Sequence, residues 1–112
     1  MQKGRFAMEK IIVLCTVNDL AVAKNLSKTL LEKKLIACAN IVPQLVSIYE
    51  WKGEIVSDSE YLMIFKTKSL LFEELKTEIK SLHPYEVPEI ISLKIDNGSK
   101  DYFDWIDTVV KS

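Results

Sequence analysis

Two long strand-like segments, separated only by a turn, occupy the middle of this sequence and limit the folds that it can adopt. Residues 36–51 and 54–67 are rich in β-branched and aromatic side chains, and Lys52-Gly53 between them is typical of a tight turn. Each arm has about 14 residues and would reach roughly 45 Å if unbent, at about 3.3 Å per residue. A compact domain of 112 residues is only about 35 Å across. The hairpin must therefore bend sharply or project beyond the domain.

Apolar side chains occupy both faces of the first arm. Side chains at alternate positions of a strand share a face. The odd-numbered apolar residues of this arm are Ile41, Leu45, Tyr49 and Trp51, and the even-numbered ones are Val42, Val46 and Ile48. Because one layer of helices covers only one face of a sheet, the second face and the projecting tip predict self-association. The alternative is a monomer whose last helix folds over the exposed face. Pro43 cannot donate to a strand ladder and predicts a bulge or bend.

The remaining segments complete a recognisable order of elements. A continuous apolar run predicts a central strand over 10–17, and Asn18-Asp19 begins an amphipathic helix that ends near Lys33-Lys34, with Asp19 in its first turn. Ser69 is a plausible N-cap for a second helix that ends at His83-Pro84. A short strand over 89–95 and a helix over 101–110 follow. This β-α-β-β-α-β order with an extra C-terminal helix predicts an α+β fold, the ferredoxin-like split β-α-β sandwich.

Composition excludes several functional classes. The formal net charge is −1 and no basic stripe occurs, so neither nucleic acid nor an anionic membrane is an expected partner. No apolar run has the roughly 18–20 residues that span a bilayer. We expect residues 1–8 to be a disordered extension or a cloning remnant and 9–112 to form one domain. The start has no apolar core of an export signal, which predicts the cytoplasm and free thiols at Cys15 and Cys38.

Three side chains have the chemistry of soft-metal ligands. Cys15, Cys38 and His83 suit copper or zinc, although no pair has the close spacing of established metal motifs. The alternative is two small buried hydrophobic residues and a loop histidine. A nucleophilic Cys15–His83 pair lacks a glycine-rich oxyanion loop and an orienting partner. We therefore do not expect an enzyme.

Acidic side chains offer a second kind of site. Glu54, Asp58, Glu60, Glu86 and Glu89 could bind hard divalent cations through oxygen, but Glu54 and Asp58 fit a solubilising role on the hairpin equally well. Glu86 and Glu89 bracket Pro88 in the loop after His83 and are the more suggestive pair. Lys66 has the parity of apolar neighbours, so it either pairs with an acid or lines a ligand pocket.

Several motifs together resemble one known family. They are Val13-Leu14-Cys15-Thr16, Ala37-Cys38-Ala39-Asn40-Ile41-Val42-Pro43, Ser47-Ile48-Tyr49-Glu50-Trp51-Lys52-Gly53, Lys66-Thr67, His83-Pro84-Tyr85-Glu86-Val87-Pro88-Glu89 and Asp101-Tyr102-Phe103-Asp104-Trp105. In this order, over about residues 9–110, they resemble the CutA divalent-cation tolerance family.

The resemblance implies a homotrimer of ferredoxin-like protomers, similar in fold and assembly to PII signalling proteins. It implies a non-enzymatic role in tolerance of copper and other divalent cations. Cu(II) or another divalent cation would bind at Cys15 and His83, with Cys38 sometimes included; some members carry a second histidine where this chain has Leu82. The long hairpin would pack in the trimer through Val46, Ile48, Tyr49 and Trp51. The alternative function is a PII-like regulatory module that binds a small ligand or protein partner in clefts between subunits, lined by Lys66, His83, Tyr85, Glu86 and Glu89.

Overall fold

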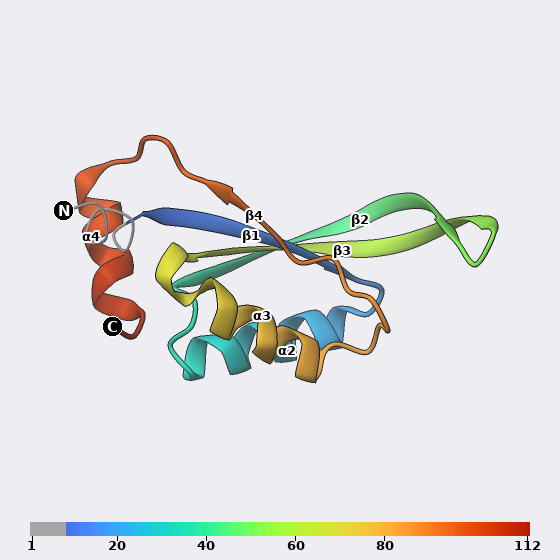
Figure 1. The fold of residues 1–112 in the computed structure, drawn as a ribbon, viewed down its shortest axis with the longest axis horizontal. Helices are drawn as coiled ribbons and strands as arrows, with labels where there is room; N and C mark the ends of the chain where they lie inside the picture. Colours follow the sequence, from blue (N-terminus) through green and yellow to red (C-terminus); the bar gives the residue numbers. More distant parts are fainter. Residues whose placement is uncertain (1–8) are drawn as a thin grey trace.

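A computed structural model describes residues 9–112 as a four-stranded antiparallel sheet with helices packed on it (Figure 1). The strand order is β2-β3-β1-β4. The elements in chain order are β1 (Lys10–Val17), α2 (Leu20–Glu32), β2 (Cys38–Trp51), β3 (Glu54–Lys68), the 3-10 turn η1 (Ser69–Leu71), α3 (Phe72–Leu82), β4 (Ile91–Lys94) and α4 (Lys100–Val109). This confirms the predicted α+β, ferredoxin-like arrangement. The predicted N-terminal extension lies outside the described residues.

The β2–β3 hairpin projects from the body of the domain, as its length predicts (Figure 1). The described chain measures 48 × 26 × 25 Å along its principal axes. At the tip, Lys52 and Gly53 have φ values of 52° and 83°, and Trp51 pairs with Glu54. Two positive φ values are typical of a type I′ turn, whose twist matches that of the two strands. The sequence Lys-Gly therefore closes a two-residue hairpin.

A β-bulge interrupts β2 at the predicted place. The pairing shifts between Val42, which is opposite Leu62, and Leu45, which is opposite Glu60. Gln44 lies within the bulge and has a φ of 61°. The extra residue reverses the side-chain parity of the strand, because side chains alternate between faces. The sequence-based grouping of Ile41 with Leu45 and the aromatic residues beyond it was therefore wrong.

The helix starts differ from the predictions in detail. Asp19 is the N-cap of α2 rather than a first-turn residue, and its carboxylate accepts from the Val22 N–H at 3.2 Å. The prediction that Ser69 caps the second helix was wrong. Ser69 begins η1, whereas α3 starts at Phe72 with no capping side chain. Glu73 and Glu74 in the first turn of α3 favour this start through the helix dipole.

The hydrophobic core lies between the sheet and helices α2 and α3. Odd-numbered residues of β1 and β3 face this layer, among them Val13, Cys15 and Phe65, each fully buried. On the opposite face of the sheet, α4 packs at one end, where Ile106 is buried and Asp107 pairs with Lys10. Ile91 and Leu93 on β4 remain 51% exposed. The C-terminal helix thus does not cover the whole second face of the protomer.

No helix within residues 9–112 combines the length and the apolar character that crossing a membrane requires.

Candidate functional site

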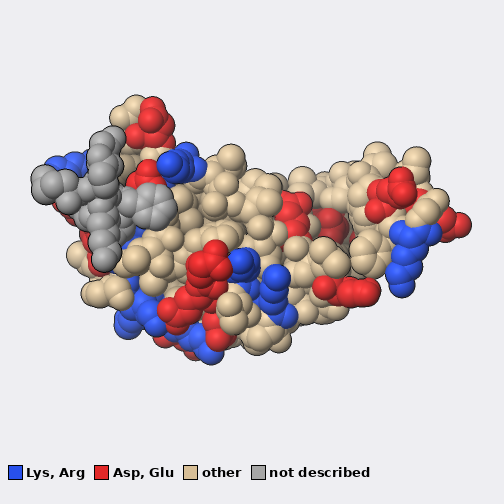
Figure 2. All heavy atoms as spheres, viewed as in Figure 1, with Lys and Arg blue, Asp and Glu red and all other residues tan. Residues whose placement is uncertain are grey.

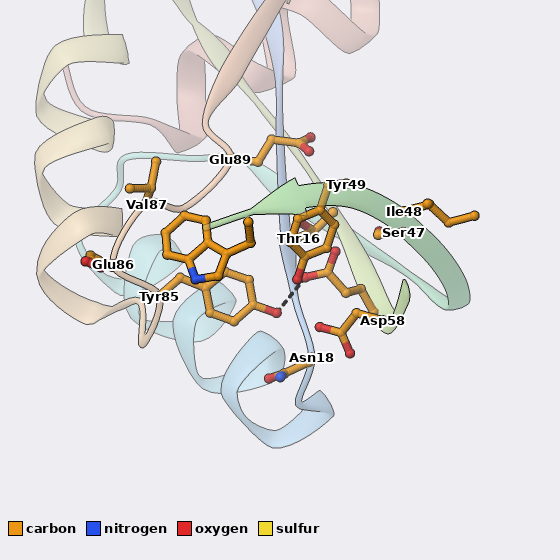
Figure 3. Close-up of a pocket in the computed structure, with 12 residues that line it drawn as sticks. Thr16, Asn18, Ser47, Ile48, Tyr49, Asp58, Tyr85, Glu86, Val87 and Glu89 are labelled. Atoms are coloured by element: carbon orange, nitrogen blue, oxygen red, sulfur yellow. Dashed lines mark hydrogen bonds between the residues drawn. The ribbon is translucent and has the colours of Figure 1, made fainter. Parts of the chain in front are cut away.

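A cleft of about 620 Å³ lies at the base of the projecting hairpin (Figure 3). Its walls come from the end of β1, both arms of the hairpin and the loop between α3 and β4. The lining residues are Thr16, Asn18, Ser47, Ile48, Tyr49, Trp51, Asp58, Glu60, Tyr85, Glu86, Val87 and Glu89. This volume is in the range of small-molecule sites.

The bulge in β2 decides which side chains of the hairpin face this cleft. Beyond it, Ser47 is opposite Asp58 and Leu45 is opposite Glu60, so these pairs share a face. Tyr49 and Trp51 have the parity of Ser47 and lie on the same side. Without the extra residue, Val46 and Ile48 would occupy that side. The structure instead leaves Val46 and Ile48 69% and 70% exposed, and Ile48 points away from the cleft in Figure 3.

A short hydrogen bond joins the two walls of the cleft. The Tyr85 hydroxyl donates to Glu60 Oε2 at 2.5 Å, and Glu60 is only 4% exposed. Burial, this hydrogen bond and the charges of Glu60 and Asp58 all raise the pKa of Tyr85. Partial burial and the same two carboxylates also raise the pKa of Tyr49. The interior of the cleft is therefore electronegative.

The surface around the cleft shares this character. In Figure 2, acidic side chains gather at the narrowing between the body of the domain and the hairpin. Among residues 9–112, no lysine or arginine lines the cleft. Figure 3 shows Tyr49, Tyr85 and Asp58 directed toward one central space, with Glu89 at its upper edge.

His83 fastens the loop that carries Tyr85 to the end of β1. It is 7% exposed, and its Nε2 lies 2.8 Å from the carbonyl oxygen of Thr16. Its Nδ1 accepts from the backbone N–H of Tyr85 at 3.1 Å. A carbonyl only accepts and an N–H only donates, so the ring is neutral with its proton on Nε2. Both nitrogens of His83 are therefore engaged by the backbone.

The two cysteines are free thiols on opposite faces of the sheet. Cys15 is fully buried in the core; burial, aided by the charges of Glu89 and Glu60, raises its pKa to about 12. Cys38 is opposite Lys66, which in turn is opposite Ile12 on β1. Cys38 is therefore two strands and three residues away from Cys15, about 14 Å from strand spacing and rise. Its Sγ lies 3.9 Å from Asn40 Oδ1.

The three predicted copper ligands thus do not converge within one protomer. Between residues 9 and 112, no group of three or more histidine, cysteine, aspartate or glutamate side chains is arranged to hold a metal ion. A neutral buried thiol, a thiol on the other face of the sheet and a histidine bonded through both nitrogens do not make a preformed copper site.

The residues that were predicted to line a ligand cleft are only partly brought together by the fold. Tyr85, Glu86 and Glu89 line the cleft of the protomer. Lys66 does not: its ammonium group donates to Asn40 Oδ1 on the neighbouring strand. It is six residues along β3 from Glu60, about 20 Å at 3.3 Å per residue. Within its own protomer Lys66 is outside the cleft.

Sequence reasoning underestimated the acids of the hairpin. Asp58 and Glu60 form one wall of the cleft, and Thr16, Asn18 and Ser47 contribute polar groups that no motif indicated. One weak signal was present, since Glu60 has the parity of the apolar Leu62 and Ile64, although Asp58 and Lys66 share that parity as well. A buried carboxylate at such a position is a candidate for a functional site.

Comparison with known proteins identifies relatives along most of the chain. The sequence matches the family described as "CutA1 divalent ion tolerance protein" over residues 11–109. It is 50% identical over 95 residues to "Divalent-cation tolerance protein CutA" of Thermus thermophilus, covering 85% of this chain and 92% of that protein. It is 47% identical over 91 residues to "Protein CutA" of Homo sapiens, covering 81% of this chain but 51% of that protein.

Solved structures agree with this assignment. The crystal structure of CutA1 from Oryza sativa superposes with a TM-score of 0.90 at 37% identity, covering 92% of this chain and 94% of that one. The Thermus thermophilus divalent cation tolerance protein gives a TM-score of 0.88 at 46% identity, covering 91% and 99%. This chain belongs to the CutA1 divalent ion tolerance protein family.

Proposed function

We propose that this protein is a homotrimeric, non-enzymatic protein that binds cations and supports tolerance of divalent cations. The observation that carries the proposal is the cleft lined by Asp58, Glu60, Glu86 and Glu89, where no lysine or arginine of residues 9–112 offsets the negative charge. Such a concave electronegative surface attracts and concentrates cations. The name of the Thermus thermophilus relative supports the connection to divalent cations.

Copper is the cation that the sequence predicts, through Cys15, His83 and Cys38. For His83 to bind copper, it would have to release the Thr16 carbonyl or the Tyr85 N–H. Titration of Cu(II) into the wild type, His83→Ala and Cys38→Ser tests this ligand set. We expect each substitution to weaken binding or lower the stoichiometry. Identical isotherms would remove the residue concerned as a ligand.

Trimer formation is supported by the apolar surface that the protomer leaves uncovered. Val46 and Ile48 are 69% and 70% exposed, and they lie on a hairpin that extends beyond the body of the domain. Light scattering after size exclusion tests this role. We expect three times the 12.8 kDa protomer mass for the wild type and a smaller mass for Ile48→Asp. Leu70→Asp is the matched control, since Leu70 is 55% exposed but lies in η1. A monomeric wild type at micromolar concentration would contradict the proposal.

The absence of catalysis is proposed from the state of the two reactive side chains. The Cys15 thiol keeps its proton at neutral pH because its pKa is about 12. The His83 Nδ1 lone pair is occupied by the Tyr85 N–H, so the ring is not free to take a proton from a thiol. We also propose the cytoplasm as the compartment, although relatives are described as periplasmic in Archaeoglobus fulgidus and chloroplastic in Arabidopsis thaliana.

A second candidate function is a regulatory module, similar to PII proteins, that binds a small ligand in the cleft or a protein partner beside it. The 620 Å³ volume and the aromatic walls favour a molecule larger than a bare metal ion. In the trimer, Lys66 would reach such a cleft only from a neighbouring subunit. A thermal-shift screen of metabolites in metal-free buffer tests this function, and a screen without a hit would count against it.

A further inference from the structure

We propose that the cleft binds an organic cation, an ammonium or guanidinium group attached to a small apolar body. The inference rests on the second proposed function, that the cleft is a ligand site, and names the chemical class of its ligand. It depends on three features of the cleft: a buried carboxylate without a counter-charge, aromatic walls around it, and acids too dispersed for a bare metal ion.

The buried carboxylate is Glu60. It is 96% buried and accepts one hydrogen bond, from the neutral Tyr85 hydroxyl. Within residues 9–112 it has no ion pair with any lysine or arginine, and neither have Asp58 and Glu89. Removing a carboxylate from water is costly unless a positive charge or several donors compensate it. Glu60 therefore favours a cation that comes from outside the protomer.

The aromatic side chains around Glu60 suit a cation that carries carbon. Tyr49, Trp51 and Tyr85 line the same cleft, and Figure 3 shows Tyr49 and Tyr85 on two sides of the central space. Aromatic faces attract ammonium and guanidinium groups, Trp most strongly, and they also bury the attached apolar body. Burial and the nearby carboxylates of Glu60 and Asp58 raise the pKa of both Tyr49 and Tyr85, as expected for phenols in an electronegative cleft.

A bare divalent ion would need oxygens that converge within a few ångströms. Calcium, for example, takes six to eight oxygen ligands at about 2.3–2.6 Å. The acids of the cleft lie on separate walls, Glu60 on β3 and Glu89 in the loop before β4, and the described residues contain no metal-like grouping. Dispersed carboxylates around aromatic rings instead match the extended charge of an organic cation.

The test uses benzylammonium as probe and neutral benzyl alcohol as its matched analogue. The chain contains only two tryptophans, Trp51 in the cleft and Trp105 on α4, so their indole N–H signals in NMR report position directly. We expect benzylammonium to shift the Trp51 signal but not that of Trp105, and to bind about ten-fold or more tightly than benzyl alcohol. Assignment uses Trp105→Phe.

Glu60→Gln preserves the acceptor for Tyr85 but removes the charge, so it should abolish the preference for benzylammonium. Glu32→Gln removes one charge from the exposed end of α2 and should change nothing. Equal binding of the two probes, a Trp51 signal that benzylammonium moves in neither the wild type nor Lys66→Met, or full benzylammonium binding by Glu60→Gln would each overturn the proposal.

Two further measurements distinguish a free organic cation from a lysine of a neighbouring subunit, and the organic-cation proposal from the divalent-cation function. If the wild type ignores benzylammonium but Lys66→Met binds it, the ammonium group in the trimer comes from a neighbouring subunit, and the specificity of the cleft stands. If Cu(II) moves Trp51 whereas benzylammonium binds neither protein, the organic-cation proposal fails and the divalent-cation function survives.

Discussion

Tyr85→Phe removes the hydroxyl that joins the α3–β4 loop to the hairpin. The substitution deletes the 2.5 Å hydrogen bond to Glu60 Oε2 and leaves a 96% buried carboxylate without its donor. Hydrogen bonds to charged groups contribute about 1.5–3 kcal/mol to stability. Because Tyr85 is itself only partly buried, we take the lower end, about 1.5 kcal/mol. At about 1.5 kcal/mol per molar urea, this loss lowers the unfolding midpoint by about 1 M.

Urea unfolding followed by far-UV circular dichroism measures this shift, at one fixed protein concentration because subunit assembly contributes to apparent stability. Tyr61→Phe is the matched control, since Tyr61 is adjacent to Glu60 in β3 and its hydroxyl makes no hydrogen bond within residues 9–112. A double-mutant cycle with Glu60→Gln isolates the pair. Equal midpoints for Tyr85→Phe and Tyr61→Phe would show that this hydrogen bond does not hold the loop to the hairpin.

Three further predictions concern the backbone and the buried thiol. Gly98→Ala should lower the free energy of unfolding by about 1–3 kcal/mol, because its Cβ would lie 2.4 Å from Phe103 Cε1; thermal denaturation should show recovery when Phe103→Leu is added, and an unchanged melting temperature would contradict the clash. Gln44→Gly should stabilise and Gln44→Val destabilise by about 0.5–1 kcal/mol, since φ is 61° there; equal urea midpoints would exclude strain at the bulge. Cys15 has its pKa raised from 9.0 to about 12 in the fold. The unfolded chain therefore loses this proton first, and stability falls as pH rises from about 9 toward 12, by up to about 1.4 kcal/mol per pH unit; Cys15→Ala should show a shallower fall in urea unfolding between pH 8 and 11, and equal slopes would refute it.

The elements of the fold were predictable because each has a strong local signal. The apolar periodicity of residues 10–17 and of the two long helices determines strand or helix without reference to the rest of the chain. Lys52-Gly53 and Pro43 likewise marked the turn and the bulge. Helix starts were less certain, because Ser69 is a good capping residue by type but is placed in a 3-10 turn by the backbone that leaves β3.

Pro43 alone did not predict which side chains of the hairpin lie on which face of the sheet. A proline indicates that the ladder is interrupted, but not how many residues the interruption inserts. One extra residue was enough to separate Ile41 from Leu45 and to bring Tyr49 and Trp51 to the cleft. Counting parity across an irregular position thus fails even when the irregularity itself is correctly located.

The prediction of a site from residue type alone favoured the soft-metal ligands over the acidic residues that line the cleft. Cysteine and histidine are conspicuous by type, yet His83 uses both ring nitrogens to hold a loop, and Cys15 packs as a neutral core residue. The contact between Tyr85 and Glu60, 25 residues apart, depends on that loop and on the register of β3. What the sequence did contain was Glu60 directly before the apolar stretch that begins at Tyr61 in the same strand. Burying a carboxylate there has a cost that a solubilising residue would not incur, so the burial of Glu60 depends on its surroundings in the fold more than on its residue type.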